Sequence, residues 1–464
     1  MLRSVPIPEI RPESSPSTQS PVATGRQPLS ALTELAGCVM FGVACADMVL
    51  GVYTLIRAAL YLIAVALAFA GAGFKLRMPA LGWLFLLAGG LYLLKALLYP
   101  PVPMLVRSDI RNILVGSAFL ATLNLADLTA ETWEHFQLKV HRTVLSVATV
   151  GAVLGLAKFM YFIQGGIVPS LMDPERGYPL GSSLQVDYNF YSLPLLMGIF
   201  SAFWLMKRDP SSLWRTGALL SVPALVGGVL LSGSRRGLTI VVIAAPLLLL
   251  WALLSGKGTA LPENGGKIRW KTLAVGLALV AGIGVLKRDA LDDFAGRFLS
   301  ADSLVQITQR WETFQDGTYS DSRLNHWSIA LDRLARFRPL QYLFGEGFAY
   351  VTDLGADPEV EEDYPHNFLL SSMLYGGLVQ TTCLVLMLAM AMSRLARRAA
   401  GSGMLCAWFL LLLYYLSTSC NSFFSSEAAV FLAVVGLGVK RFGPKRVVTA
   451  EFRSQGLYPG LHAT

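Results

Sequence analysis

The chain has 464 residues, of which 54% are hydrophobic and 15% are charged, and its formal net charge is +8. A soluble globular protein carries roughly 25% charged residues, so this composition excludes an ordinary soluble enzyme and indicates a polytopic membrane protein. Apolar runs of about 20 residues recur along the chain, which favours an all-α bundle over a β-barrel. We see no internal repeat, which disfavours transporter folds built from repeated halves.

The chain begins with a polar tail. Residues 1–28 are rich in Pro and Ser and lack the apolar core of a signal peptide, so we expect a disordered, retained tail. About 12 transmembrane helices are predicted after it, in the hydrophobic segments 30–50, 52–73, 79–99, 110–127, 143–166, 189–206, 214–232, 237–255, 271–287, 366–392, 403–419 and 425–439. Helices 1–9 then lie within 29–287, a long loop with amphipathic helices within 288–365, helices 10–12 within 366–440, and a second tail within 441–464.

Basic residues are divided unequally between alternate loops. One set of loops and both tails hold 22 of the 38 Lys and Arg residues, whereas the opposite short loops hold 5. Because cytoplasmic loops are enriched in Lys and Arg, we expect both termini in the cytoplasm and the long loop outside. Residues 287–365 carry 8 basic and 15 acidic residues, a net charge of −7, and long loops are exempt from this rule.

Two arginines stand at the outer end of the seventh predicted helix. The sequence Ser-Gly-Ser-Arg-Arg-Gly at 232–237 places Arg235 and Arg236 beside a membrane core, where charges are costly unless they are paired, functional or snorkelling. A guanidinium binds phosphate oxygens through two parallel hydrogen bonds. The pair therefore predicts a site for an anionic headgroup such as a diphosphate, and snorkelling to lipid headgroups is the alternative.

A second arginine motif lies in the long loop. Residues 320–327 read Ser-Asp-Ser-Arg-Leu-Asn-His-Trp and open a predicted amphipathic helix, with Arg323 in its first turn. The start of a helix favours anions, so Arg323 at this position suits a phosphate group. The alternative is a surface arginine on an interfacial helix.

Histidine is rare in this chain, and its positions are informative. His135 and His141 fall in a predicted cytoplasmic loop and His462 in the tail, so only His326 and His366 are expected on the outer face. His366 lies where the long loop re-enters the membrane. A neutral imidazole there can take a proton from an attacking hydroxyl, with a structural cap as the alternative. His326 is the second candidate base.

The remaining motifs carry less chemistry. The acidic run 359–363 precedes His366 and is best interpreted as a solvated loop, although it could orient the imidazole or hold a cation. No spacing is typical of a metal site, so no metal and no cofactor are expected. Gly345-Glu346-Gly347 indicates a turn.

In their order and spacing, these motifs resemble the bacterial O-antigen ligase and O-antigen polymerase superfamily of membrane glycosyltransferases. The resemblance runs from about Asp187 to Gly377, while residues 1–180 match only in being hydrophobic. It is carried by Asp187-Tyr188-Asn189, Ser234-Arg235, Ser322-Arg323-x-x-x-Trp327, Gly345-x-Gly347, His366-Asn367-x-Leu369 and Gly376-Gly377. It implies a GT-C-like multi-pass protein of the bacterial inner membrane, with an active site that faces the periplasm.

The resemblance also implies a reaction. A glycan on undecaprenyl diphosphate would be moved to an acceptor hydroxyl of lipid A–core, with inversion and without a metal. The implied catalytic residues are His366 as general base and Arg235 and Arg323 as diphosphate ligands. The implied substrate-binding residues are Arg236, Arg297, Asn189 and Asn367. Arg297 is a competing match for the loop arginine, and the role of Arg236 stays open.

Other functions fit the same sequence. Within the superfamily, an O-antigen or exopolysaccharide polymerase and a protein O-oligosaccharyltransferase differ from the ligase only in the acceptor. A transporter of lipid-linked glycans is the alternative from another class, but most ionisable residues here lie at the ends of segments and not deep within them. Membrane lipids are expected partners, and nucleic acid is not.

Overall fold

The computed structural model describes residues 31–51, 54–76, 78–98, 104–122, 130–163, 184, 188–234, 236–237, 239–241, 322–347, 365–396, 399–419 and 422–424. Throughout these ranges the regular elements are α-helices, which confirms the all-α prediction. The helices are α1 (Ala31–Leu50), α2 (Thr54–Gly71), α3 (Ala80–Leu98), α4 (Met104–Thr122), α5 (Ala130–Ile163), α6 (Tyr188–Arg208), α7 (Ser212–Leu231), α12 (Ser322–Ala335), α13 (Pro339–Phe344), α15 (Phe368–Ala396) and α16 (Ala399–Ser419).

Six of the described helices are long and apolar enough to cross a membrane. These spans lie in α1, α3, α5, α6, α7 and α15, and shorter apolar helices cover Leu55–Gly71 and Ala407–Thr418. The predicted segments 271–287 and 425–439, and nearly all of 237–255, lie outside the described residues, and each remaining segment overlaps a helix. The chain is thus helical and suited to a membrane, and the total of about 12 spans stays a prediction.

Helix α5 begins earlier than the sequence predicts. The segment that contains His135 and Lys139 was expected to be a loop, but α5 starts at Ala130 and continues for 34 residues. At 1.5 Å per residue it is about 50 Å long, which exceeds the thickness of the hydrocarbon core. Its polar first turns are stabilised by Glu34 of α1, which forms an ion pair with Lys139 and contacts the ring of His135. One turn further along, Arg142 forms two hydrogen bonds of 2.7 and 2.8 Å with Asp209, the residue after α6.

His141 also lies in α5, and its role is structural. The side chain is fully buried and its ring stacks on Trp204 at 4.4 Å, with Trp408 of α16 at 4.6 Å. The hydroxyl of Ser201 donates to a backbone carbonyl, so it accepts the hydrogen of His141 Nδ1 across 3.1 Å. The prediction that His141 lies in a loop is therefore wrong: the residue belongs to α5, and its ring packs between two indoles inside the bundle.

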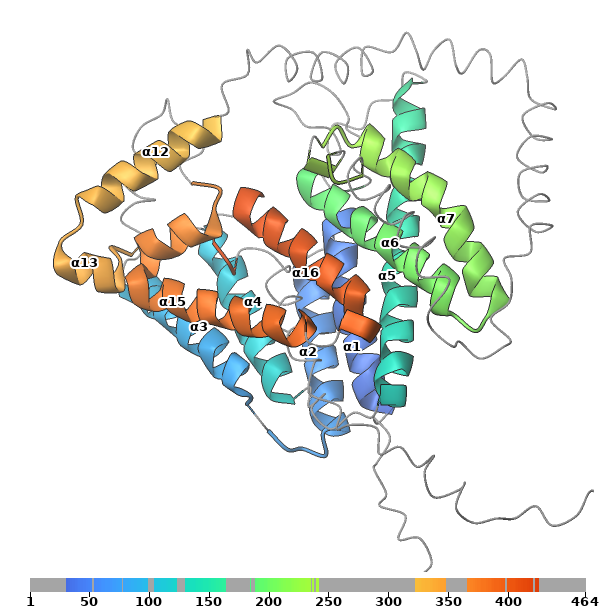
Figure 1. Cartoon of the computed structure of the whole chain (residues 1–464), viewed down its shortest axis with the longest axis horizontal. Coiled ribbons are helices and arrows are strands. Elements are labelled where there is room, and N and C mark those ends of the chain that lie inside the picture. Colours follow the sequence, from blue (N-terminus) through green and yellow to red (C-terminus); the bar gives the residue numbers. More distant parts are fainter. Residues whose placement is uncertain are drawn as a thin grey trace, which may run out of the picture.

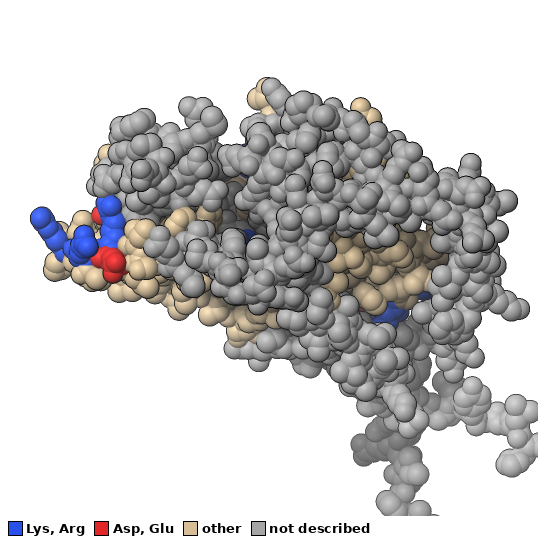
Figure 2. All heavy atoms as spheres, turned by 90° about the horizontal axis from the view of Figure 1, so that it is seen from above, with Lys and Arg blue, Asp and Glu red and all other residues tan. Residues whose placement is uncertain are grey.

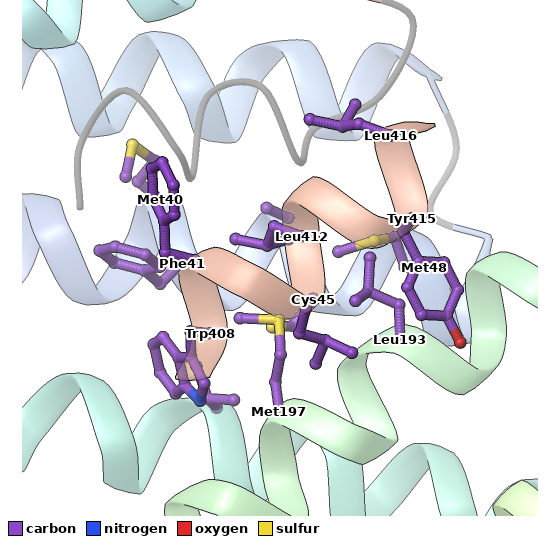
Figure 3. Close-up of a cluster of buried hydrophobic side chains, with 14 of the residues drawn as sticks. Met40, Phe41, Cys45, Met48, Leu193, Met197, Trp408, Leu412, Tyr415 and Leu416 are labelled. Atoms are coloured by element: carbon purple, nitrogen blue, oxygen red, sulfur yellow. The ribbon is translucent and has the colours of Figure 1, made fainter. Parts of the chain in front are cut away.

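The helices form one packed bundle (Figure 1). α5 packs against α1, α6 and α7, while α15 packs against α3, α13 and α16. α16 contacts both α15 and α6, so it joins the two groups of helices. Figure 3 shows this junction, where apolar side chains of α1, α6 and α16 interdigitate. Among the buried residues there are Met40, Phe41, Cys45, Met48, Leu193, Met197, Trp408, Leu412, Tyr415 and Leu416.

Candidate functional site

His366 lies at the junction of the long loop and helix α15, as the sequence predicts. The helix begins at Phe368, and Asn367 caps it, because its Oδ1 accepts the backbone N–H groups of Leu369 at 3.0 Å and Leu370 at 3.3 Å. His366 itself has a φ of +44°, which is uncommon for a residue with a Cβ. The backbone therefore turns sharply at the imidazole, and the ring is half-buried beside the start of the helix.

Helix α12 brings a second histidine to this junction. The indole Nε1 of Trp327 donates to the carbonyl oxygen of Pro365 across 2.6 Å, which ties α12 to the residue before His366. The ring of His326 then lies 5.9 Å from the ring of His366, with 20° between the planes. Two imidazoles thus face each other at the end of one helix. A neutral imidazole can accept a proton near neutral pH, so both histidines are suited to act as a general base at this junction.

The arm that carries His326 is anchored further along α15 by backbone contacts. We call residues 322–347, which contain α12 and α13, the arm. α15 is interrupted at Gly377, where φ is 66° and ψ is −162°. The interruption exposes two carbonyl oxygens, and the turn after α13 supplies their donors: Glu346 N–H to Leu374 at 2.9 Å and Gly347 N–H to Tyr375 at 3.1 Å. The predicted Gly-Glu-Gly turn is confirmed, and it is a docking element.

Glycine is required on both sides of this contact. A Cβ on Gly345 would fall 2.5 Å from the backbone nitrogen of Gly376, where only backbone atoms lie. Gly345 also has a φ of 69°, which L-residues rarely adopt. Lys95 of α3 completes the contact, because its Nζ donates to the carbonyl oxygen of Gly345 across 3.3 Å. The Gly345-x-Gly347 and Gly376-Gly377 motifs therefore contact each other, and we call this backbone contact between the arm and α15 the glycine joint.

The arginine-bearing segment after α7, which we call the arginine loop although Arg236 and Gly237 are helical, is held by a chain of hydroxyl groups. Ser192 of α6 donates to Ser234 at 3.2 Å and shares a 2.5 Å hydrogen bond with Tyr415 of α16. Ser234 in turn accepts the backbone N–H of Gly237 at 3.2 Å. All three hydroxyl-bearing side chains are buried, and Arg236 next to them is only 7% exposed. The loop is thus built into the bundle, and a guanidinium lies almost fully inside it.

Residues near the end of α16 are linked to both parts of the candidate site. Tyr415 near that end shares a hydrogen bond with Ser192, which in turn donates to Ser234 beside the arginines. Phe423, just beyond α16, packs against Phe368 of α15 at 5.7 Å between ring centroids. Phe368 is two residues after His366. The last turns of α16 and the residues after them therefore connect the loop of Arg236 to the start of the histidine-bearing helix.

A buried carboxylate supports this region, and the sequence did not reveal it. Asp109 of α4 accepts hydrogen bonds from the hydroxyl groups of Tyr92 and, at 2.6 Å, Ser422. Nearby, Asn112 donates to the carbonyl oxygen of Phe424 across 2.8 Å. These bonds fix the turn after α16 to α3 and α4. Asp109 was overlooked because the predicted segment began at residue 110, although an ionisable residue within a membrane helix is itself a signal.

Other predicted site residues are described only in part. Arg235, Arg297 and the acidic run 359–363 lie outside the described residues, as do the side chains of Asn189 and Arg323. The backbone places Arg323 in the first turn of α12, one turn before His326, and Asn189 at the start of α6, one turn before Ser192. Where the chain is described, no three His, Cys, Asp or Glu side chains gather as metal ligands would.

Comparison with known proteins adds no further assignment. No protein-family model matches this chain, and no curated protein sequence matches it either.

Proposed function

We propose that this protein is a membrane glycosyltransferase that moves a glycan from undecaprenyl diphosphate to an acceptor hydroxyl, in the manner of an O-antigen ligase that acts on lipid A–core. The observation that carries the proposal is that α12 and His366 lie together at the start of α15. His366 stands on a capped helix junction, and α12 is bound to that junction through Trp327. α12 also contains Arg323 in its first turn, so the proposed base and the proposed phosphate ligand belong to adjacent elements.

In the proposed reaction, His366 is the general base. As the acceptor oxygen forms a bond with the anomeric carbon, its proton passes to a ring nitrogen of His366. The bond from that carbon to the diphosphate oxygen breaks, and the leaving undecaprenyl diphosphate retains the electron pair. A single displacement of this kind inverts the anomeric configuration. A positioned base of this type contributes roughly 10²- to 10⁴-fold to the rate.

The arginines would stabilise the leaving group. Negative charge grows on the diphosphate as the bond breaks, and donors already oriented toward it lower the barrier. We assign this role to Arg235 and Arg323. Arg236 supports it from within the bundle, because a guanidinium that is 7% exposed is weakly screened and acts over a longer range than one in water. Asn189 and Arg297 are proposed to contact the glycan or its diphosphate.

Asn367 caps helix α15, and this limits the contacts that its side chain can make with a substrate. Its side-chain oxygen already accepts two backbone N–H groups of α15. Only its amide nitrogen is therefore left to donate to a substrate. We propose that Asn367 mainly positions His366, and that contact with the acceptor is its second role.

The experiment is a transfer assay with purified protein, a lipid-linked glycan donor and lipid A–core, in which mass spectrometry follows the acceptor. His366→Ala is expected to abolish transfer, and Arg235→Lys and Arg323→Lys to lose most of it, because an ammonium lacks the planar fork of donors. Arg208→Lys, at the far end of α6, is the matched control and should retain activity. EDTA should have little effect on the wild-type protein.

Two results would overturn the proposal. If His366→Ala transfers glycan as fast as the wild-type protein, the histidine is not the base. If both lysine variants are fully active, bulk positive charge suffices, and the arginines interact with lipid headgroups instead of a shaped diphosphate site.

A further inference from the structure

The arm has an apolar outer face that no described element covers. Its inner face packs on α15, where Phe337, Ala330 and Leu374 form a small buried cluster. On the outside, α13 has no buried residue at all. Leu340 is 71% exposed and Phe344 is 46% exposed. Large apolar side chains that are exposed together on one short helix mark a surface for interaction with a protein or a membrane.

The position of α13 along the bundle indicates which partner this is. Gly345 directly follows α13, and its carbonyl oxygen accepts Lys95 Nζ at 3.3 Å. Lys95 lies in the last turn of α3, a 19-residue apolar helix about 28 Å long, which matches the hydrocarbon thickness of a bilayer. The same turn of α3 exposes Leu97, at 77%. α13 therefore lies at the level where α3 leaves the hydrocarbon, next to a surface that faces lipid.

The charges beside α13 fit a headgroup layer. Arg336 and Arg338 immediately precede the helix, and both side chains are exposed. Arg333, by contrast, is paired with Glu346. Figure 2 shows basic atoms projecting, with some acidic atoms beside them, at the end of the molecule where the arm lies. Arg336 and Arg338 belong to a loop that is acidic overall, so the positive charge beside α13 is a local feature of the arm.

We propose that the arm is an interfacial membrane anchor that recognises anionic phospholipid headgroups. In this arrangement Leu340, Leu343 and Phe344 enter the boundary between acyl chains and headgroups, and Arg336 and Arg338 bind the lipid phosphates. Apolar insertion combined with basic residues is how interfacial helices bind bilayers. Because the inner face of the arm carries His326, anchoring would also fix the histidine pair relative to the membrane surface.

The test measures the depth of α13 in full-length protein reconstituted into nanodiscs. A nitroxide label is attached at Leu340→Cys, in a background whose five native cysteines are replaced by Ala. Its relaxation by oxygen, which concentrates in lipid, is compared with its relaxation by a water-soluble nickel chelate. Leu87→Cys, on the exposed side of α3, is the lipid reference, and Asp332→Cys, on the exposed side of α12, is the aqueous reference. The label at Leu340 is expected to lie between the two.

Headgroup recognition is tested by adding phosphatidylglycerol to phosphatidylcholine nanodiscs. The label should move deeper in the anionic bilayer. Each arginine should shift the equilibrium between the membrane-bound and the membrane-free state of α13 by about 5-fold toward the bound state. Arg336→Gln with Arg338→Gln should abolish this response, and Lys75→Gln with Arg208→Gln, a control pair elsewhere on the protein, should keep it. A label as water-exposed as the one at Asp332 would overturn the proposal. So would a depth that does not respond to phosphatidylglycerol, or that responds equally in the arginine variant.

Discussion

Substitution of Gly377 by alanine should release the arm from α15 while the rest of the bundle stays folded. Gly377 has a φ of 66° and a ψ of −162°, a backbone conformation that is essentially restricted to glycine. A Cβ at this position would lie 2.5 Å from the carbonyl carbon of Leu343 and closer still to the backbone nitrogen of Gly345. These are backbone atoms of the arm, so no side chain can rotate away.

The size of the effect follows from two contributions. The strained backbone costs about 1–3 kcal/mol, and overpacking of a tight contact costs about 1–3 kcal/mol. Together they destabilise the docked arm by about 2–6 kcal/mol. The two hydrogen bonds that dock the arm, from Glu346 and Gly347 to carbonyl oxygens of α15, would then open in a larger fraction of molecules.

Hydrogen exchange monitored by mass spectrometry measures this opening. At the lower limit of about 2 kcal/mol, the amides of Glu346 and Gly347 should exchange about 30-fold faster in Gly377→Ala than in the wild-type protein. Gly90→Ala is the matched control, because Gly90 lies in α3 with no atom within 4 Å of its added Cβ. Unchanged protection in Gly377→Ala, or equal loss of protection in Gly90→Ala, would refute the idea that the glycine joint holds the arm.

Three further predictions concern the histidine junction. His366→Ala should lower glycan transfer by roughly 10²- to 10⁴-fold and leave the melting temperature of the purified protein unchanged; an equal loss of folding would make the residue structural. Asn367→Ala should destabilise the start of α15 by about 1 kcal/mol, as seen in thermal melts, whereas Asn367→Asp should keep the cap. Trp327→Phe should lose the hydrogen bond to Pro365, worth about 1 kcal/mol, and make the arm easier for a protease to cleave; unchanged cleavage would contradict this.

Much of the helical framework could be predicted because its signals are local. The segments 189–206 and 214–232 were expected, and the helices found are Tyr188–Arg208 and Ser212–Leu231. The junction at His366 was also predictable, since an Asn before an apolar run is a typical helix cap. These features depend on a few neighbouring residues, so the sequence alone contains them.

The features that the sequence hid depend on contacts between distant segments. α5 was expected to start at residue 143, because its polar first turns resemble a loop in the sequence. The structure shows that Lys139 and Arg142 in these turns pair with Glu34 and Asp209 of distant segments. His326 was ranked second as a base, because nothing nearby in the sequence shows that Trp327 ties it to Pro365. Such pairs are set by the tertiary packing, which local patterns do not encode.

The most direct test of the proposed transferase uses proteoliposomes that contain the purified protein, a fluorescent glycan on undecaprenyl diphosphate and lipid A–core. The quantity measured is the fraction of fluorescent glycan that becomes covalently attached to lipid A–core, with His366→Ala as the blank. The account predicts attachment with release of one undecaprenyl diphosphate per glycan, and attachment that is slower by roughly 10²-fold or more in the variant. Movement of the intact lipid-linked glycan across the bilayer without cleavage of its diphosphate bond would contradict the account and indicate a transporter.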